Sequence, residues 1–299
     1  MIRKRFGQHF LEPAWVEKVV RAIAPQPNET FIEIGPGRGA LTRPLVARAK
    51  AVVAYEIDRD LAAGLTATAP PNLTVVEGDF LERAANPEFL ANPESQVPNP
   101  ESRVPNPESR VPNPKSRANP ESQVPNPVAV RVAGNLPYNV ASPILFKLVE
   151  LYARGVPLVD ATVMLQREVA DRLLAPPGGR EYGVLSVLIQ HAAHVEMLLK
   201  LPAGAFRPPP RVHSALVRLR FHPPEPAVKD PAVFAAIVQA VFTRRRKTLA
   251  NALLAYHGRV SVSPAEALAQ AGLDGARRPE MLSIGEFARL ADVYASVSP

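Results

Sequence analysis

Short runs of β-branched and other apolar residues alternate with helical patterns through the first half of the chain. The runs predict strands, and the segments between them carry apolar residues at the spacing of amphipathic helices. Strands that alternate with helices are typical of an α/β fold, with a parallel sheet between helices on both faces. The predicted strands cover 30–34, 51–57, 73–77, 128–133 and 161–166, and the predicted helices cover 41–48, 58–66, 142–152 and 167–174.

The pattern changes towards the C-terminus. Two apolar runs, 194–201 and 214–221, predict an antiparallel pair of strands that closes one edge of the sheet. Beyond Pro223 and Pro224 only helical patterns follow, over 231–244, 248–256, 264–271 and 283–295. We therefore expect an α/β domain over residues 1–222 and a smaller, all-helical domain over residues 223–299.

Residues 92–127 repeat the unit Asn-Pro-Glu-Ser-(Gln/Arg)-Val-Pro with one shortened copy. Two prolines in each unit fix φ and remove backbone donors, so this heptad does not indicate a coiled coil. We expect an extended, disordered insertion in the first domain. Because the insertion precedes a strand at the amino edge of the sheet, we expect its deletion to leave catalysis nearly unchanged.

Composition limits the chemistry. The chain contains no cysteine, which excludes disulfides and thiolate zinc sites, so we expect a bound organic cofactor and no metal. No apolar run approaches the roughly 20 residues that cross a bilayer, and we expect a cytoplasmic protein. The net charge of +7 favours a polyanionic partner. The basic clusters predict either an RNA-binding surface or ordinary solvated faces, and they lie at 3–5, 207–220, 244–247 and 277–278.

The first predicted strand ends in a glycine-rich turn. Gly35, Gly37 and Gly39 allow the backbone to approach a nucleotide-like ligand at the carboxyl edge of the sheet. Such a turn is also typical of dinucleotide-binding oxidoreductases, or it can be a plain connection between strand and helix. The turn alone leaves all three interpretations open.

Carboxylates follow the next two strands. Glu56 closes the second strand, where its side chain can accept both hydrogen bonds from a ribose diol. Asp79 closes the third strand and can accept from an adenine amine, while Phe80 covers a face of the ring. The alternative for Asp79 is a helix cap.

The fourth strand leads into Asn135, Leu136, Pro137 and Tyr138. An adenine amine is a poor nucleophile, because its lone pair is delocalised into the ring. The Asn135 oxygen and the Leu136 carbonyl can accept hydrogen bonds from both amine hydrogens, Pro137 stiffens the loop, and Tyr138 can stack on an extruded base. This site favours methyl transfer from a sulfonium donor. Pro36 crowds the turn that a pyrophosphate would need, and no hydride-transfer site is visible, so the oxidoreductase is disfavoured.

With these residues the sequence resembles the ribosomal RNA adenine dimethyltransferases, which dimethylate two adjacent adenines near the 3′ end of small-subunit (16S) rRNA. The resemblance covers the chain apart from the repeat. Besides the turn, the carboxylates and the tetrapeptide, the similar segments are 6–11, 206–212 with Ser214 and Ala215, 245–249 and 251–253.

The resemblance implies a Rossmann-like methyltransferase sheet that binds S-adenosylmethionine, followed by a helical RNA-binding domain. It implies that His9 and Leu11 close over the cofactor and that Gly35 lies beneath it. It also implies that Glu56 binds the ribose, that Asp79 binds the adenine and that Asn135 contacts both cofactor and target. Phe206 is implied to contact the target base, with ordinary core packing as the alternative.

The partner implied is small-subunit rRNA in a pre-30S particle, bound by a monomer that acts in subunit biogenesis. Two alternatives stay open. One is the related enzyme that methylates an adenine of large-subunit rRNA and confers antibiotic resistance. The other is an RNA-binding ribosome assembly factor whose catalysis is dispensable.

Overall fold

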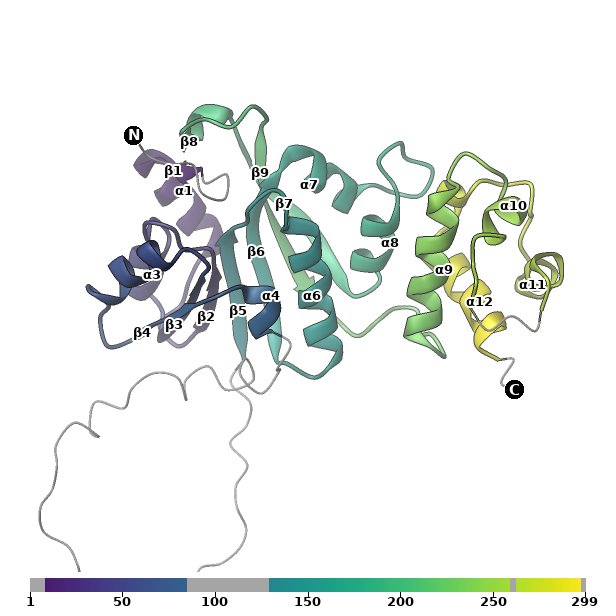
Figure 1. Cartoon of the computed structure of the whole chain (residues 1–299), viewed down its shortest axis with the longest axis horizontal. Coiled ribbons are helices and arrows are strands. Elements are labelled where there is room, and N and C mark those ends of the chain that lie inside the picture. Colours follow the sequence, from purple (N-terminus) through teal and green to yellow (C-terminus); the bar gives the residue numbers. More distant parts are fainter. Residues whose placement is uncertain (1–8, 85–128, 259–261, 297–299) are drawn as a thin grey trace, which may run out of the picture.

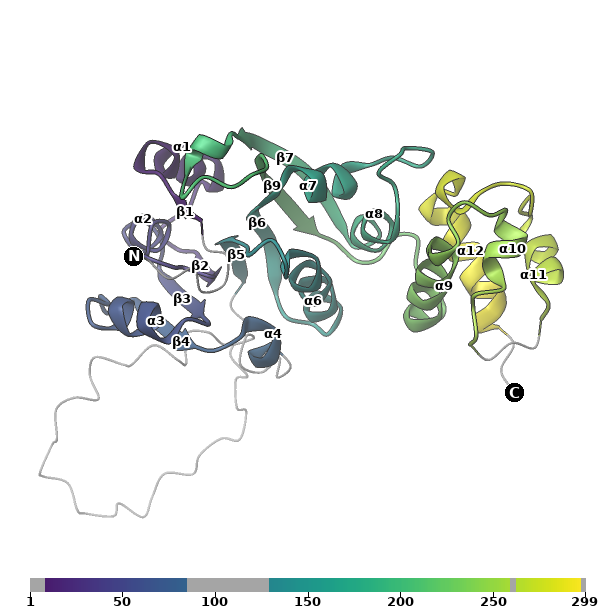
Figure 2. The ribbon, with the colours of Figure 1, turned by 45° about the horizontal axis from the view of Figure 1, so that its top comes forward.

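The computed structural model describes residues 9–84, 129–258 and 262–296. The repeat at 92–127 and the basic cluster at 3–5 lie outside these ranges, so the predictions for both stay predictions. The described residues form an α/β body and a group of C-terminal helices beside it (Figures 1 and 2). Helix α9 lies next to α8 of the α/β body in both views.

A seven-stranded sheet forms the centre of the body, in the order β4-β3-β2-β5-β6-β9-β7. Its first five strands in this order are parallel, and β9 runs antiparallel to both β6 and β7. The strands are β2 (Thr30–Ile34), β3 (Ala51–Glu56), β4 (Leu73–Glu77), β5 (Val130–Asn135), β6 (Leu158–Gln166), β7 (Ala193–Leu201) and β9 (Ser214–Phe221). This topology confirms the predicted α/β fold and the antiparallel edge.

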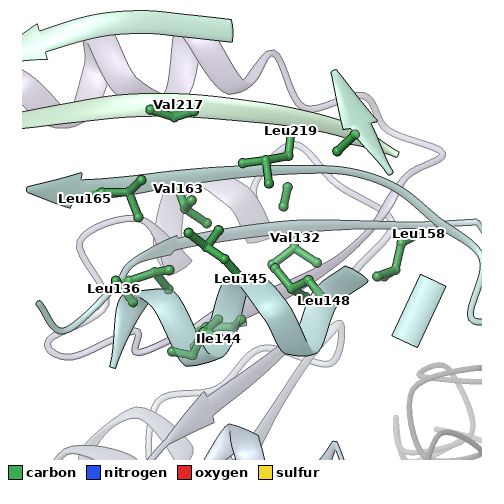
Figure 3. Close-up of a cluster of buried hydrophobic side chains, with 14 of the residues drawn as sticks. Val132, Leu136, Ile144, Leu145, Leu148, Leu158, Val163, Leu165, Val217 and Leu219 are labelled. Atoms are coloured by element: carbon green, nitrogen blue, oxygen red, sulfur yellow. The ribbon is translucent and has the colours of Figure 1, made fainter. Parts of the chain in front are cut away.

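Helices cover both faces of the sheet because successive strand residues point to opposite sides. On one face, Val132 lies in one apolar cluster with Ile144 and Leu145 of α6 (Figure 3). The cluster also contains Ile32. On the other face, Phe31 packs in the cluster that contains α1 and α2. The helices of the body are α1 (Pro13–Ile23), α2 (Thr42–Val46), α3 (Arg59–Thr66), α4 (Phe80–Arg83), α6 (Ala141–Ala153), α7 (Arg167–Leu174) and α8 (Val184–Gln190).

A two-stranded ribbon links distant parts of the chain. Strand β1 (Phe10–Leu11) pairs antiparallel with β8 (Phe206–Arg207). The backbone N–H of Glu12 also donates to the carbonyl of Ala205, at 2.9 Å. The ribbon therefore holds the beginning of the described chain against the loop that leads into β9.

The C-terminal helices share one apolar core with part of the body. Buried residues of α9 (Pro231–Thr243), α10 (Leu249–Leu253), α11 (Pro264–Ala271) and α12 (Ile284–Ala295) form this cluster. Tyr182 and Val187, from the α7–α8 loop and from α8, belong to the same cluster. The Tyr182 ring meets the edge of Phe242 with 6.2 Å between centroids. The helical group is thus packed onto α8 as well as joined to β9 by the chain.

A buried ion network lies where β5 begins. The Arg131 guanidinium donates two hydrogen bonds to the Asp160 carboxylate, at 2.9 and 2.8 Å, and a third to Glu29 at 2.8 Å. A fourth hydrogen bond reaches the carbonyl of Ile23 at the end of α1. The network therefore joins α1, β5 and β6 at the amino edge of the sheet, opposite the ends of the strands that face a ligand in such folds.

Most predicted elements agree with the structure to within a few residues, but several details were wrong, and strands β1 and β8 were not predicted. The fourth strand runs two residues further than predicted, so Asn135 is its last residue. Strand β6 starts at Leu158, three residues before the predicted start. The helix predicted over 248–256 spans only Leu249–Leu253. Helices α1, α4 and α8 were not predicted.

Candidate active site

A cavity opens at the carboxyl edge of the parallel strands, where β2, β3, β4 and β5 end. Every residue predicted to bind the cofactor lines it, together with the predicted tetrapeptide. The predicted residues at the cavity are His9, Leu11, Gly35, Gly37, Glu56, Asp79, Phe80, Asn135, Leu136, Pro137 and Tyr138. Segments up to 130 residues apart in the sequence therefore meet at one edge of the sheet, as expected for an open α/β fold.

The glycine-rich turn adopts a backbone that other residues would strain. Gly35, Gly37 and Gly39 have φ values of +70°, +57° and +78°. The N–H of Gly35 donates to the Tyr55 carbonyl at 2.9 Å, which continues the β2–β3 pairing into the turn. A side chain at Gly37 would approach the ring of Phe10 to 3.2 Å. The turn therefore forms a close-packed floor of backbone atoms.

Glu56 is fixed at the end of β3 by two backbone donors. Its carboxylate accepts from the N–H of Gly37 at 2.8 Å and from the N–H of Asp58 at 2.9 Å. Burial raises the pKa of Glu56, and these hydrogen bonds oppose the increase. A carboxylate has about four acceptor positions, so two remain for hydroxyl groups of a ligand.

Asp79 caps a helix, as the alternative interpretation predicted, and its binding of an adenine stays a prediction. Its Oδ1 atom caps α4 by accepting from the N–H of Leu81 at 2.9 Å, and the residue also lines the cavity. Phe80, which follows it, is buried and meets the ring of Tyr55 edge to face, with 5.5 Å between centroids. The helix start therefore orients the carboxylate, and the two aromatic rings form an apolar wall.

The tetrapeptide that begins with the last residue of β5 is held at its first two residues. The N–H of Leu136 donates to the Met164 carbonyl at 3.2 Å, and the Leu136 side chain is buried against α6 (Figure 3). The Nδ2 atom of Asn135 donates to the His9 carbonyl at 2.8 Å. This contact orients the amide so that its oxygen is the atom left to accept from a ligand.

His9 joins three parts of the site. Its carbonyl accepts from Asn135, and its ring packs on the ring of Tyr138 at 5.7 Å between centroids and 25° between planes. Its Nδ1 atom donates to the Pro208 carbonyl at 2.6 Å. The ring nitrogen of His9 is therefore bonded to the protein's own backbone.

Phe206 lies outside the cavity. Its side chain is 1% exposed and packs in the cluster with Leu11, Leu201 and Leu216. It is nevertheless the ribbon partner of Leu11, a residue of the cavity wall. Contact between Phe206 and a target base thus stays a prediction, and core packing is what the structure contains.

Glu33 was not predicted as a site residue. This residue lies in β2, is 1% exposed and lines the cavity. Its Oε2 atom has no hydrogen-bond partner among the described residues. Burial raises the pKa of Glu33 to about 8, the charge of Glu56 adds to the increase, and Thr42 opposes it in part. Its position in the sequence, two residues before Gly35, could have indicated that Glu33 lies at the cavity.

The charges at the cavity distinguish between the two candidate cofactors. The carboxylates of Glu56 and Asp79 line it beside Glu33, whose raised pKa of about 8 favours the neutral acid at pH 7. Among the described lining residues there is no lysine or arginine. A dinucleotide brings a pyrophosphate that requires positive charge or several N–H donors. S-adenosylmethionine brings a sulfonium and an ammonium group, and both fit an acidic cavity. The fold and this site define a methyltransferase that uses S-adenosylmethionine.

The particular family follows from comparison with known proteins. A family model described as ribosomal RNA adenine dimethylase matches residues 1–296. A protein of Acinetobacter baylyi named ribosomal RNA small subunit methyltransferase A is 40% identical to this chain, and the alignment covers 97% of this chain and 91% of that protein. A protein of the same name from Leptothrix cholodnii is also 40% identical, with 96% of this chain and 90% of that protein covered. The chain belongs to the ribosomal RNA adenine dimethylase family.

Solved structures agree on the fold. A dimethyladenosine transferase from Plasmodium falciparum aligns with a TM-score of 0.66 and 22% identity, covering 94% of this chain and 96% of that one. The 23S rRNA methyltransferase ErmE aligns with a TM-score of 0.57 and 25% identity, covering 95% and 99%. In the part of the chain that the structure describes, no helix is long and apolar enough to span a membrane.

Proposed function

We propose that this protein transfers methyl groups from S-adenosylmethionine to the exocyclic amines of two adjacent adenines near the 3′ end of small-subunit rRNA, and thereby acts in small-subunit biogenesis. The products are dimethyladenosines. The observation that carries the proposal is the orientation of Asn135, whose amide nitrogen is held by His9 while its oxygen is left for the amine. The names of the 40% identical relatives support the small subunit as the substrate.

The residues of the tetrapeptide act on the amine. Asn135 and the carbonyl of Leu136 accept hydrogen bonds from the two amine hydrogens, which favours a pyramidal nitrogen with a localised lone pair. Tyr138 stacks on the extruded base and fixes its plane. When bound, S-adenosylmethionine supplies an activated methyl group. No strong general base is required, since in-line placement provides much of the acceleration.

Other residues of the cavity hold the cofactor. We assign the ribose hydroxyls to the remaining acceptor positions of Glu56 and the adenine amine to Asp79, with Phe80 against the adenine ring. Gly35 and Gly37 form the floor beneath the cofactor, and His9 and Leu11 cover it. The two carboxylates supply the acceptors and negative charge, and the wall supplies the apolar contact, that a cationic nucleoside needs.

We assign RNA binding to residues 223–299. Exposed cations follow α9 and precede α12 on this helical group, and they are Arg244, Arg246, Lys247 and Arg278. We expect the protein to act as a monomer, because the large apolar side chains that the described residues expose are scattered over separate elements. Because the proposed substrate is a ribosomal subunit, we expect the protein to be located where these subunits are assembled, which we take to be the cytoplasm.

A second candidate is methylation of large-subunit rRNA. The alignment with ErmE, at 25% identity over nearly the whole chain, favours it. The higher identity to the small-subunit enzymes ranks it second. An assembly factor with dispensable catalysis is the third candidate.

One experiment separates these candidates. The protein is incubated with labelled S-adenosylmethionine and unmethylated small or large subunits, and modified adenines are mapped by mass spectrometry. We expect two dimethyladenosines in small-subunit rRNA, and label confined to large subunits would contradict the proposal. Asn135→Ala should abolish transfer, while Asn72→Ala, which removes an amide bonded to two carbonyls away from the cavity, should not. Normal subunit assembly with inactive Asn135→Ala would favour a separate scaffold role.

A further inference from the structure

Tyr138 makes a contact that the proposed reaction does not use. Its phenolic oxygen lies 2.7 Å from the Oγ atom of Ser214, so the two hydroxyls share a hydrogen bond. The two residues are 76 positions apart in the sequence, one in the loop after β5 and the other at the start of β9. A side chain outside the cavity therefore reaches the ring that is proposed to stack on the target base.

Ser214 is one of the most firmly held residues of the sheet. It is 1% exposed and is paired with Gln166 of β6 on one side and with Leu201 of β7 on the other. Its backbone is thus fixed by two neighbouring strands. The hydroxyl is held in place by the sheet. Tyr138 lies in a turn that, among the described residues, is closed by the hydrogen bond from the N–H of Val140 to the carbonyl of Pro137, at 3.1 Å.

We propose that Ser214 is a positioning residue: its hydroxyl holds the Tyr138 ring at the place where the target adenine stacks, on the face opposite His9. The phenolic oxygen lies on the axis of the Cβ–Cγ bond, so the hydrogen bond to Ser214 fixes the direction of the side chain. The His9 ring packed on Tyr138 holds the plane of the ring. The inference rests on the proposed function, because it concerns the orientation of the base in that reaction.

The role differs from general stabilisation of the fold. Ser214 does not line the cavity, so its hydroxyl acts on the reaction only through Tyr138. Loss of the hydroxyl therefore affects the orientation of the bound base, which sets kcat. The affinity for the cofactor and for the ribosomal particle should be preserved.

The test compares Ser214→Ala, Tyr138→Phe and the double variant in the subunit methylation assay. Both single variants remove the same hydrogen bond and keep the Tyr138 ring or its phenyl equivalent. We expect each to lower kcat about tenfold with KM for both substrates nearly unchanged. The double variant should lose no more than either single variant, because the shared contact can be lost only once. Ser214→Thr, which keeps a hydroxyl, should restore most of the rate.

Ser186→Ala is the matched control. Ser186 is also fully buried, and its Oγ atom is hydrogen-bonded to the Arg172 carbonyl and the N–H of Gly183, but it lies in α8 outside the cavity. Its loss should lower the melting temperature and leave kcat unchanged. Full activity of folded Ser214→Ala, or additive losses in the double variant, would overturn the positioning role while the proposed function stands. A wild-type protein that methylates neither subunit would overturn both.

Discussion

Replacing Glu33 by glutamine should change how the stability of the protein depends on pH. The side chain is buried beside Glu56, and its pKa is raised from the ordinary 4.5 to about 8. Glutamine has nearly the same shape and cannot ionise. The variant therefore removes the titration and keeps the packing.

The sign and the size follow from linkage. Between pH 4.5 and 8 the unfolded chain loses the Glu33 proton while the folded protein keeps it, so the free energy of unfolding of the wild type falls as the pH rises. The interval from 4.5 to about 8, at about 1.36 kcal/mol per pH unit, limits this loss to about 5 kcal/mol. That is a large part of the roughly 5–15 kcal/mol that stabilises a typical domain.

Urea unfolding of both proteins, followed by circular dichroism at pH 5, 6, 7 and 8, measures the effect. The difference in the free energy of unfolding between variant and wild type should increase steadily with pH in favour of Glu33→Gln. Subtraction removes the titrations that the two proteins share. A difference that stays constant within about 0.5 kcal/mol from pH 5 to 8 would show that Glu33 ionises at its ordinary pKa in the folded protein.

Three further substitutions test the packing. Gly134→Ala should lower the free energy of unfolding by about 2 kcal/mol or more in urea, because the new Cβ would lie 2.5 Å from the Ile34 carbonyl oxygen. The control Gly64→Ala, on an open helix surface, should leave the stability unchanged or raise it. Tyr182→Phe should leave the melting temperature unchanged or raise it, since the buried hydroxyl has no hydrogen-bond partner among the described residues; a fall of several degrees would contradict this. Arg131→Met should cost about 3–5 kcal/mol because it removes both guanidinium hydrogen bonds of the buried Asp160 and leaves it with Arg218 at 3.5 Å, and a cost below 1 kcal/mol would refute this assignment.

The fold was predictable from the sequence wherever one periodicity dominated. The buried strands β2 and β3 are short runs dominated by apolar and β-branched residues, and their predicted limits match the structure within one residue. Helix α1 has an amphipathic pattern and a proline at its start, so the signal was present although it was not used. Helix α8, by contrast, is seven residues of mostly apolar sequence, and such a short run does not distinguish helix from strand.

The cavity was predictable because parallel strands bring their carboxyl ends to one edge. Residues directly after strands, such as Glu56, Asp79 and Asn135, were therefore found by position. The contacts that orient them were not, because they join segments without local relation in the sequence. The bond between Asn135 and His9 spans 126 positions, and that between Tyr138 and Ser214 spans 76. Such partners meet through the tertiary structure, to which the pairing of β1 with β8 and of β6 with β9 contributes.

The shared core between α8 and the C-terminal helices constrains how the protein meets a large substrate. Because Tyr182 is buried among residues of α9 and α12, the helical group does not pivot on the chain after β9 without exposing that core. The distance between the cavity and the basic residues of the helical group is then fixed. We expect an enzyme with a fixed distance between its two binding regions to select its target by that distance. An adenine is then methylated when the RNA places it at the right distance from a second contact. Recognition of this kind reads the architecture of a folded particle and requires little information from the bases beside the target.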